Sequence, residues 1–195
     1  LLTHPEQAPG DEQLSRYTAL FERRLNGEPI AYLLGEREFY GLDLKVSPAT
    51  LIPRPETELL VELALQRIPQ PSPQPSPKGR GGKYRVLDLG TGSGAIALSI
   101  AHARPDVEVV AVDASEAALE VARENALRLN IGNVRLLRSD WFSALHGEHF
   151  DLIVSNPPYV AANDAHLAQG DLRFEPRAAL ASGAAHGHGC VDREH

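Results

Sequence analysis

The chain has 195 residues, 43% of them hydrophobic, which is enough for one main domain with a small appendage. Its net charge of −7 argues against a nucleic-acid partner, because proteins that bind nucleic acids usually present a basic face to the phosphates. Its apolar runs are far too short for a membrane span, no signal peptide is visible, and its single cysteine is typical of the reducing cytoplasm. His186 and His188 beside Cys190 form too small a set for a structural metal, so we expect no metal site.

The amino-terminal part of the chain predicts a helix, a hairpin and a second helix. Apolar side chains recur at helical spacing over residues 11–26. The next segment alternates between polar and apolar residues, so we expect a β-hairpin with strands at 31–37 and 38–46 that turns near Gly41. A proline in its first position and acidic residues in its first turn favour a helix from Pro55 to about residue 68.

A glycine-rich loop lies between a predicted strand at 85–89 and a predicted apolar helix. The loop alternates glycine with small hydroxyl residues over Gly90, Thr91, Gly92, Ser93 and Gly94. Such a loop lets the backbone turn tightly against a ligand, and the helix N-terminus behind it offers N–H groups to a carboxylate. The spacing differs from the G-x-G-x-x-G of dinucleotide-binding proteins, and no Gly-Lys-Ser/Thr follows, as it would in a P-loop.

Two further strands lead to acidic residues. The strand at 107–112 ends at Asp113, and a carboxylate in this position commonly accepts both ribose hydroxyls of an adenosine ligand. The strand at 134–138 leads to Asp140, whose carboxylate can accept a hydrogen bond from an adenine amino group. Trp141 follows, and its indole would pack near the base.

The turn Asn156-Pro157-Pro158-Tyr159 follows a predicted buried strand at 150–155. The Asn156 side-chain oxygen can accept one N–H. Because Pro158 holds Pro157 in an extended conformation, the Pro157 carbonyl can accept a second N–H. Tyr159 adds an aromatic face for a planar group. This clamp suits a flat NH2 group, such as a side-chain amide or the exocyclic amine of a base, that must be turned toward an electrophile.

Each of these features also has a simpler interpretation. The tetrapeptide is compatible with an ordinary proline-rich turn, and Asp113 with a helix cap. Asp140 and Trp141 are compatible with a loop and a partly buried anchor. Their order favours a site, because the carboxyl ends of successive parallel strands converge on one crevice of an open α/β sheet.

This order of elements resembles the class I S-adenosylmethionine-dependent methyltransferases, which implies an α/β fold with a Rossmann-like open sheet. Segments 27–41, 47–58 and 170–176 are similar to one family, the peptide chain release factor N5-glutamine methyltransferases. The resemblance covers roughly residues 25–180 apart from 69–82, a proline- and glycine-rich insert that cannot bury a core.

The resemblance implies methyl transfer from S-adenosyl-L-methionine to the side-chain amide nitrogen (N5) of a glutamine in a peptide chain release factor, in the cytoplasm. It assigns catalysis to Asn156, Pro157 and Tyr159. It assigns the glutamine pocket to Asn156, Pro157, Pro158, Tyr159 and Phe39, with Arg54 to Glu56 nearby. It assigns cofactor binding to Gly90, Thr91, Gly92, Ser93, Gly94, Asp113, Asp140, Trp141 and Asn156.

Three alternatives stay open at this point. The first is an N5-glutamine methyltransferase that acts on a ribosomal protein. The second is a DNA adenine N6-methyltransferase, which would have the same clamp but would also need base flipping and a basic surface, and neither is evident. The third is an inactive methyltransferase fragment.

The resemblance also implies the domain organisation, with a chain that is incomplete at both ends. Residues 1–28 would be the remnant of a helical substrate-binding domain, 29–68 a hairpin and linking helix, and 69–82 a mobile insert. Residues 83–180 would be the amino-terminal half of the methyltransferase core, with about four core strands, and 181–195 a disordered tail. Because the last of these strands would keep an unpaired edge, we expect the chain alone to be poorly stable and nearly inactive.

Overall fold

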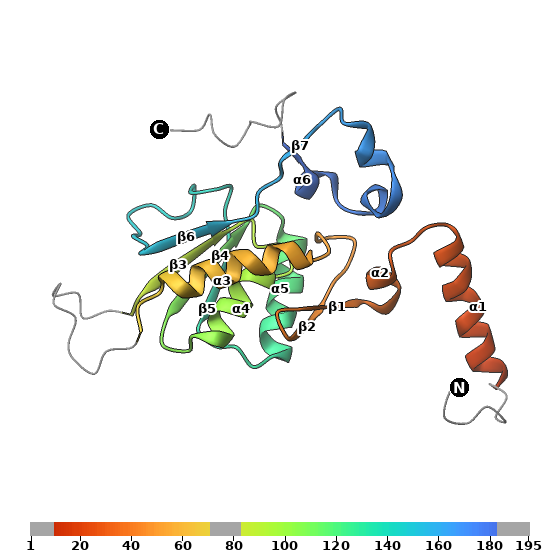
Figure 1. The fold of residues 1–195 in the computed structure, drawn as a ribbon, viewed down its shortest axis with the longest axis horizontal. Helices are drawn as coiled ribbons and strands as arrows, with labels where there is room; N and C mark the ends of the chain where they lie inside the picture. The colour runs from red at the N-terminus through yellow and green to blue at the C-terminus, as the bar shows by residue number, and fades with distance from the viewer. Residues whose placement is uncertain (1–9, 71–82, 183–195) are drawn as a thin grey trace.

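The computed structural model describes residues 10–70 and 83–182, so most of the predicted insert and tail lies outside the described residues. A parallel sheet with helices packed on it forms the core, and the amino-terminal helix stands apart from this core (Figure 1). None of the helices in the described ranges has both the length and the apolar character that a membrane crossing requires.

The amino-terminal helix is α1, Asp11–Leu25, as predicted. Acidic residues in its first turn and arginines in its last complement the helix dipole. The helix nevertheless buries none of its residues, and its apolar side chains Leu14, Tyr17, Phe21 and Leu25 are all exposed. Within the described residues, α1 therefore owes its conformation to local sequence more than to packing.

The predicted hairpin is present, but it is shorter than expected. Residues 31–34, expected in its first strand, belong instead to helix α2, Ile30–Leu34. This helix ends at Gly35, whose φ of 77° is the left-handed conformation that glycine adopts readily, so the strand begins only after it. Strand β1, Glu36–Phe39, then pairs antiparallel with β2, Leu42–Lys45, through a two-residue turn with positive φ at both positions.

Four parallel strands form the main sheet, in the order β5-β4-β3-β6. The prediction of these strands is confirmed, with bounds at Arg85–Leu89 (β3), Glu108–Asp113 (β4), Val134–Arg138 (β5) and Leu152–Ser155 (β6). The chain moves outward from β3 to β5 and then returns to the other side of β3. In an open α/β sheet, a ligand crevice forms at the carboxyl edge where the strand order reverses, which here is beside β3 and β6.

Three helices pack against one face of this sheet, and the middle one is buried on all sides. They are α3 (Glu58–Arg67), α4 (Ala95–Ala103) and α5 (Glu116–Arg128), and a 3-10 turn, η1 (Pro55–Thr57), leads into the first. All residues of α4 from 95 to 101 are buried. A helix that is apolar all round belongs in the centre of a core, so α4 holds the glycine loop that precedes it on a rigid support.

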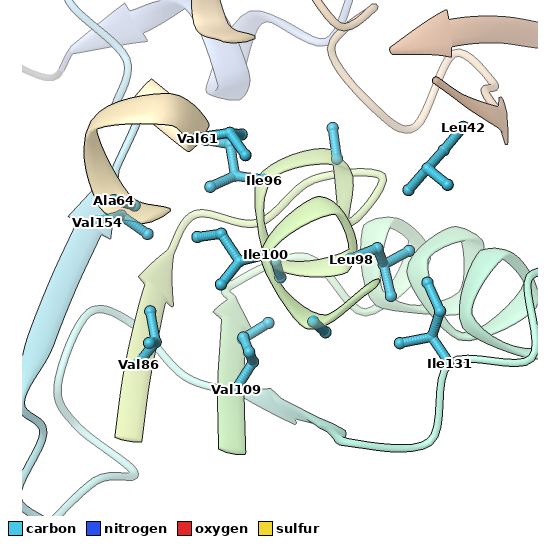
Figure 2. Packing of buried hydrophobic residues seen from close by; sticks show 14 of the residues in the cluster. Leu42, Val61, Ala64, Val86, Ile96, Leu98, Ile100, Val109, Ile131 and Val154 are labelled. Carbon is cyan, nitrogen blue, oxygen red and sulfur yellow. The ribbon is translucent and has the colours of Figure 1, made fainter. Parts of the chain in front are cut away.

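Figure 2 shows how α4 fills this central place. Ile96 lies beside Val61 of α3, while Ile100 points to Val86 and Val109 of the sheet. Leu98 points away from these toward α5, and all of these side chains belong to one buried cluster (Figure 2). The opposite face of the sheet is covered by the segment between β5 and β6, in a second cluster with Leu87, Val110 and Leu145.

After β6 the chain forms a small lobe above the carboxyl edge of the sheet (Figure 1, blue). Its elements are β7 (Val160–Ala161), the 3-10 helices η2 (Ala165–Ala168) and η3 (Gly170–Phe174), α6 (Arg177–Leu180) and β8 (Ala181–Ser182). Strands β7 and β8 pair in parallel, so the first two residues of the predicted tail are part of a strand. The other proposed domain boundaries stay predictions.

Asn125 on α5 ties the hairpin to the core. Its side-chain oxygen accepts a hydrogen bond from the Lys45 backbone N–H at 2.7 Å, and its amide nitrogen donates to the carbonyls of Lys45 and Ser93, at 3.0 and 2.9 Å. The side chain is completely buried, so these bonds have no water to replace them. One amide therefore joins the end of β2, helix α5 and the glycine loop.

We expect Asn125→Ala to lower the free energy of unfolding by about 2–4 kcal/mol, because it leaves buried backbone groups unsatisfied. Leu127→Ala is the control, since Leu127 lies on the same helix but is 81% exposed. The control should change stability by no more than about 0.5 kcal/mol. Urea denaturation followed by circular dichroism measures both, and equal effects of the two substitutions would contradict the role of Asn125.

Candidate active site

A cavity of about 520 Å³ opens at the carboxyl edge of the sheet, where the strand order reverses. Residues at or directly after the carboxyl ends of all four strands line it, together with the glycine loop and with segments that precede and follow the main sheet in the chain. The predicted site residues on its wall are Gly90, Thr91, Gly92, Ser93, Asp113, Asp140, Trp141, Asn156, Pro157 and Pro158. The structure therefore brings together predicted site residues that lie up to 68 positions apart in the chain, from Gly90 to Pro158.

The glycine loop is held against the end of β4. The backbone N–H groups of Gly90 and Thr91 both donate to the Val112 carbonyl, each at 2.9 Å. All three glycines have positive φ, and a Cβ atom at Gly94 would lie 2.9 Å from the Leu98 side chain. The loop conformation thus requires glycine for backbone freedom and, at Gly94, for close packing.

Asp113 connects the loop to the next helix. Its Oδ2 accepts the Gly92 backbone N–H and its Oδ1 accepts the Ser115 backbone N–H, both at 2.9 Å. The cap of α5 is Ser115 itself, whose hydroxyl accepts the Ala118 backbone N–H at 3.3 Å. Asp113 therefore stabilises the turn before α5 and also borders the cavity. A structural role at the start of α5 and the predicted ribose-binding role are thus compatible for this carboxylate.

Asp140 and Trp141 both line the cavity beyond β5. Trp141 has a backbone φ of 51°, a conformation that residues other than glycine adopt rarely and at a cost of about 1–3 kcal/mol. The Trp141 side chain is half-buried and packs against the cluster that contains Leu87 and Val110. This packing supports the strained backbone, and the indole stays at the cavity wall.

A second cavity, of about 460 Å³, lies on the other side of the Asn-Pro-Pro-Tyr turn. Asn156 and Pro157 line both cavities, so the two spaces meet at this turn. Tyr159 lines only the second cavity and is 71% exposed, which places it at the outer rim. The Ser155 hydroxyl donates to the Leu89 carbonyl at 2.9 Å and fixes the start of the turn to the end of β3.

The structure does not place Phe39 at either cavity, so its assignment to the glutamine pocket stays a prediction. Phe39 is 1% exposed, belongs to the buried cluster around α4, and lines neither cavity. Its position at the end of β1, opposite Leu42, directs its ring into the core. Besides Asn156 and Pro157, the wall common to both cavities includes Leu51, Arg54 and Thr57, of which only Arg54 was expected near the pocket.

Sequence reasoning missed Leu51 because its segment has no strand or helix period, and it missed Thr57 because nothing in the first turn of the predicted helix marks which side faces a cavity. Pro53 and Pro55, which flank Arg54, were the available signal, since prolines keep a chain extended and free of backbone donors. Pro176 and Ala179 also line the first cavity and were not expected there. They come from the lobe after β6, whose position only the folded chain determines.

Asp88 lies beneath the glycine loop and is completely buried. Its Oδ2 accepts the Thr91 hydroxyl at 2.7 Å, while Oδ1 has no hydrogen-bond partner of normal geometry among the described residues. Burial raises the pKa of Asp88 to about 7, although the hydrogen bond from Thr91 and the nearby Ala97 N–H act in the opposite direction, and the charge of Asp113 adds to the rise. In the described part of the chain, no group of His, Cys, Asp or Glu side chains has the arrangement of a metal site.

The raised pKa of Asp88 predicts a pH dependence of stability. The folded protein binds this proton more tightly than the unfolded chain, in which the pKa of the aspartate is 3.8. Proton binding by Asp88 therefore adds to the free energy of unfolding in full below pH 3.8, and this added stability is lost as the pH rises through about 7. Asp88→Asn removes the titration. From pH 4 to pH 8, wild-type stability should fall relative to the variant by an amount on the order of a few kcal/mol. Urea denaturation across this range measures the difference, and Asp43→Asn, at an exposed position of β2, is the control. A constant difference would show that Asp88 titrates normally.

The comparisons with known proteins agree with this site. A family model for the methyltransferase small domain matches residues 75–182, and one for the PrmC N-terminal domain matches residues 1–35. Curated proteins named release factor glutamine methyltransferase are 54% identical in Escherichia coli (strain K12) and 52% in Xylella fastidiosa (strain 9a5c), over 92% and 94% of this chain. The chain spans 61% and 63% of the length of these relatives.

A solved structure, the human methyltransferase 10 domain containing protein, superposes with a TM-score of 0.51. It covers 72% of this chain and 64% of that protein at 19% identity, so it bears on the fold alone. The sequence relatives confirm the predicted resemblance, and the parallel sheet confirms the predicted class I methyltransferase fold. Because the methyltransferase small domain model matches more than half of its residues, this chain belongs to the methyltransferase small domain family.

Proposed function

We propose that this protein transfers a methyl group from S-adenosyl-L-methionine to the side-chain amide nitrogen (N5) of a glutamine in a peptide chain release factor, in the cytoplasm. The relatives named release factor glutamine methyltransferase support this proposal, although the chain spans only about three-fifths of their length. The single observation that carries it is the position of Asn156 and Pro157 on the wall common to both cavities. An amide held in the second cavity would face a cofactor held in the first.

The first cavity suits the proposed cofactor. Its volume of about 520 Å³ lies within the range of small-molecule sites. The glycine loop and the N-terminus of α4 provide backbone N–H groups for a carboxylate. The Asp113 carboxylate lies where ribose hydroxyls could donate to it, and Asp140 with Trp141 offers a carboxylate and an aromatic surface for a base.

The turn at Asn156 suits a primary amide as the acceptor. The Asn156 side-chain oxygen and the Pro157 carbonyl are both acceptors, and a primary amide has two N–H groups to donate. With both N–H groups held, the plane of the amide is fixed and its nitrogen is directed toward the first cavity. These acceptors also stabilise the positive charge that develops on the nitrogen. Tyr159, at the exposed rim, would contact the approaching protein substrate.

Positioning supplies most of the proposed catalysis. The sulfonium of the cofactor already provides a good leaving group, so the protein needs no nucleophilic side chain. What the chain contributes is the alignment of the nitrogen, at about 3–3.5 Å from the methyl carbon and in line with the breaking bond. The tie between Ser155 and β3 keeps the turn in register with the glycine loop, which is the geometry that such alignment needs.

The test is incubation of the protein with cofactor labelled in its methyl group and, separately, a bacterial release factor, a ribosomal protein fraction and duplex DNA. The proposal expects label in the release factor, at the amide nitrogen of a glutamine. The assay is made with this chain and with a chimera in which the chain replaces the matching part of the Escherichia coli relative. Label only in ribosomal protein or only in DNA would support the corresponding alternative, and absence of transfer by both proteins would support an inactive fragment.

Asp113→Ala should weaken binding of S-adenosyl-L-methionine by about 1.5–3 kcal/mol, because hydrogen bonds to a charged acceptor are lost. Isothermal titration calorimetry on the chimera measures the affinity. Asp43→Ala, which removes an exposed carboxylate far from the cavity, is the matched control and should leave the affinity unchanged. Equal affinities of the parent and Asp113→Ala would remove Asp113 from the ribose site.

Asn156→Ala should reduce the rate of methyl transfer on the order of 10²-fold or more, while cofactor affinity changes far less. The physical reason is the loss of one acceptor for the substrate amide, which then is neither oriented nor stabilised as charge develops. Single-turnover assays with labelled cofactor and release factor measure the rate. Asn163→Ala, an exposed asparagine in the following loop, is the control, and a rate within a few-fold of the parent would show that Asn156 does not hold the acceptor.

A further inference from the structure

Glu175 is a glutamate whose side chain is completely buried, with 0% exposed. A buried carboxylate is unfavourable unless other groups satisfy its charge. Its Oε2 accepts the Ile52 backbone N–H at 3.0 Å, and its Oε1 forms an ion pair with the Arg54 guanidinium. Both partners lie more than a hundred residues earlier in the chain, at separations of 123 and 121.

The segment that Glu175 holds is a wall of the candidate active site. Leu51 and Arg54 line both the cofactor cavity and the second cavity. The segment is also held from its other end, because the buried Tyr32 hydroxyl donates to the Thr50 carbonyl at 2.7 Å. The carboxylate of Glu175 therefore fixes the part of the wall that carries the Arg54 side chain.

Arg54 has hydrogen-bond donors left over from this ion pair. A guanidinium carries five N–H groups, and the bond to Glu175 is made through Nη2. The side chain is about one-third exposed, at 34%, and borders both cavities, so its other donors lie where a ligand would enter. Fixing one nitrogen of a planar guanidinium also orients the others, which is how arginine gains directional specificity.

The proposed acceptor has one polar atom that the Asn156 turn does not match. Asn156 and the Pro157 carbonyl accept the two N–H groups of a primary amide, but the amide oxygen is itself an acceptor and needs a donor. Pro157 and Pro158 have no backbone N–H to give. Arg54, on the same shared wall as Asn156, has the donors that this oxygen requires.

We propose that Glu175 is a positioning residue that holds the Arg54 guanidinium at the wall shared by the two cavities, where Arg54 donates a hydrogen bond to the carbonyl oxygen of the acceptor amide. This inference rests on the proposed function and extends it, because it explains how the site distinguishes an amide from an amine. The two acceptors of the turn recognise an NH2 group of either kind. The donor on Arg54 recognises only a group that also carries a carbonyl.

Glu175→Gln tests the positioning role with almost no change in size. The new amide can still accept the Ile52 N–H but no longer attracts the guanidinium. We expect kcat/KM for release factor to fall about 10–100-fold, the scale of a lost hydrogen bond to a charged group, through a higher KM and a lower kcat. The dissociation constant of the cofactor should stay within about twofold, a split that general damage to the fold would not produce.

Glu148→Gln is the matched control for this variant. Glu148 pairs with Arg85 and Arg135, but these lie at the opposite, amino edge of the sheet, away from both cavities. The control should leave kcat, KM and cofactor affinity unchanged, and thermal melts of both variants show how much stability each loses. Equal kinetic losses in the two variants would overturn the positioning role.

A second measurement is independent of methyl transfer. In the full chain labelled with ¹⁵N and saturated with S-adenosylhomocysteine, the guanidinium resonance of Arg54, assigned through Arg54→Lys, is followed while acetamide is added. The inference expects a saturable shift in the wild-type protein, little or no shift in Glu175→Gln, and no shift when ethylamine, which lacks a carbonyl, replaces acetamide.

These outcomes separate the inference from the proposed function. If neither the chain nor the chimera methylates release factor, the proposed function fails, and the acetamide titration alone decides whether Arg54 binds an amide carbonyl. If the wild-type protein methylates release factor but Glu175→Gln has the same kcat and KM, the function stands and the inference is overturned. An Arg54 resonance that does not respond to acetamide in the wild-type protein overturns the inference in either case.

Discussion

The attachment of the glycine loop to the end of β4 is the interaction on which the candidate active site depends. The Val112 carbonyl accepts two backbone N–H groups of the loop, and the Asp113 carboxylate accepts a third from Gly92. Strand β4 is paired on both sides, with β3 and β5, so its end is a fixed support. The loop therefore has one defined shape, which sets one wall of the cavity beside it.

Two long-range contacts bring the amino-terminal segments to this support. Asn125 holds the end of the hairpin and the glycine loop through three hydrogen bonds, and Glu175 holds the segment around Arg54. With these contacts, the segment 49–57 becomes the wall at which the cofactor cavity and the second cavity meet.

Two buried carboxylates near the site are neutralised in different ways. Among the described residues, Asp88 beneath the loop has no cationic partner, and burial raises its pKa to about 7 and favours the protonated form. Glu175 is paired with Arg54 and with a backbone N–H, so its charge is balanced by contacts. Asp88 supports the glycine loop from inside the core, and Glu175 holds the charged Arg54 side chain at the cavity wall.

Local sequence determined most of the core of this protein. The strands at 85–89 and 134–138 were predicted with the bounds that the structure has, because a short, largely apolar segment between turn residues identifies a strand without reference to the rest of the chain. The glycine loop, Asp113 and the Asn156 turn were located for the same reason, since each follows the end of such a strand. These features depend on neighbours within a few residues.

Only the tertiary structure decided which distant segments complete the site. Phe39 has the alternation of a hairpin residue, but whether its ring faces a pocket or the core depends on where the hairpin packs, and it packs inward. Leu51 and Arg54 reach the cavity because Glu175, more than a hundred residues later, holds their segment there. Such a contact leaves no periodicity in the sequence, because it is set by the packing of the whole chain and not by the spacing of nearby residues.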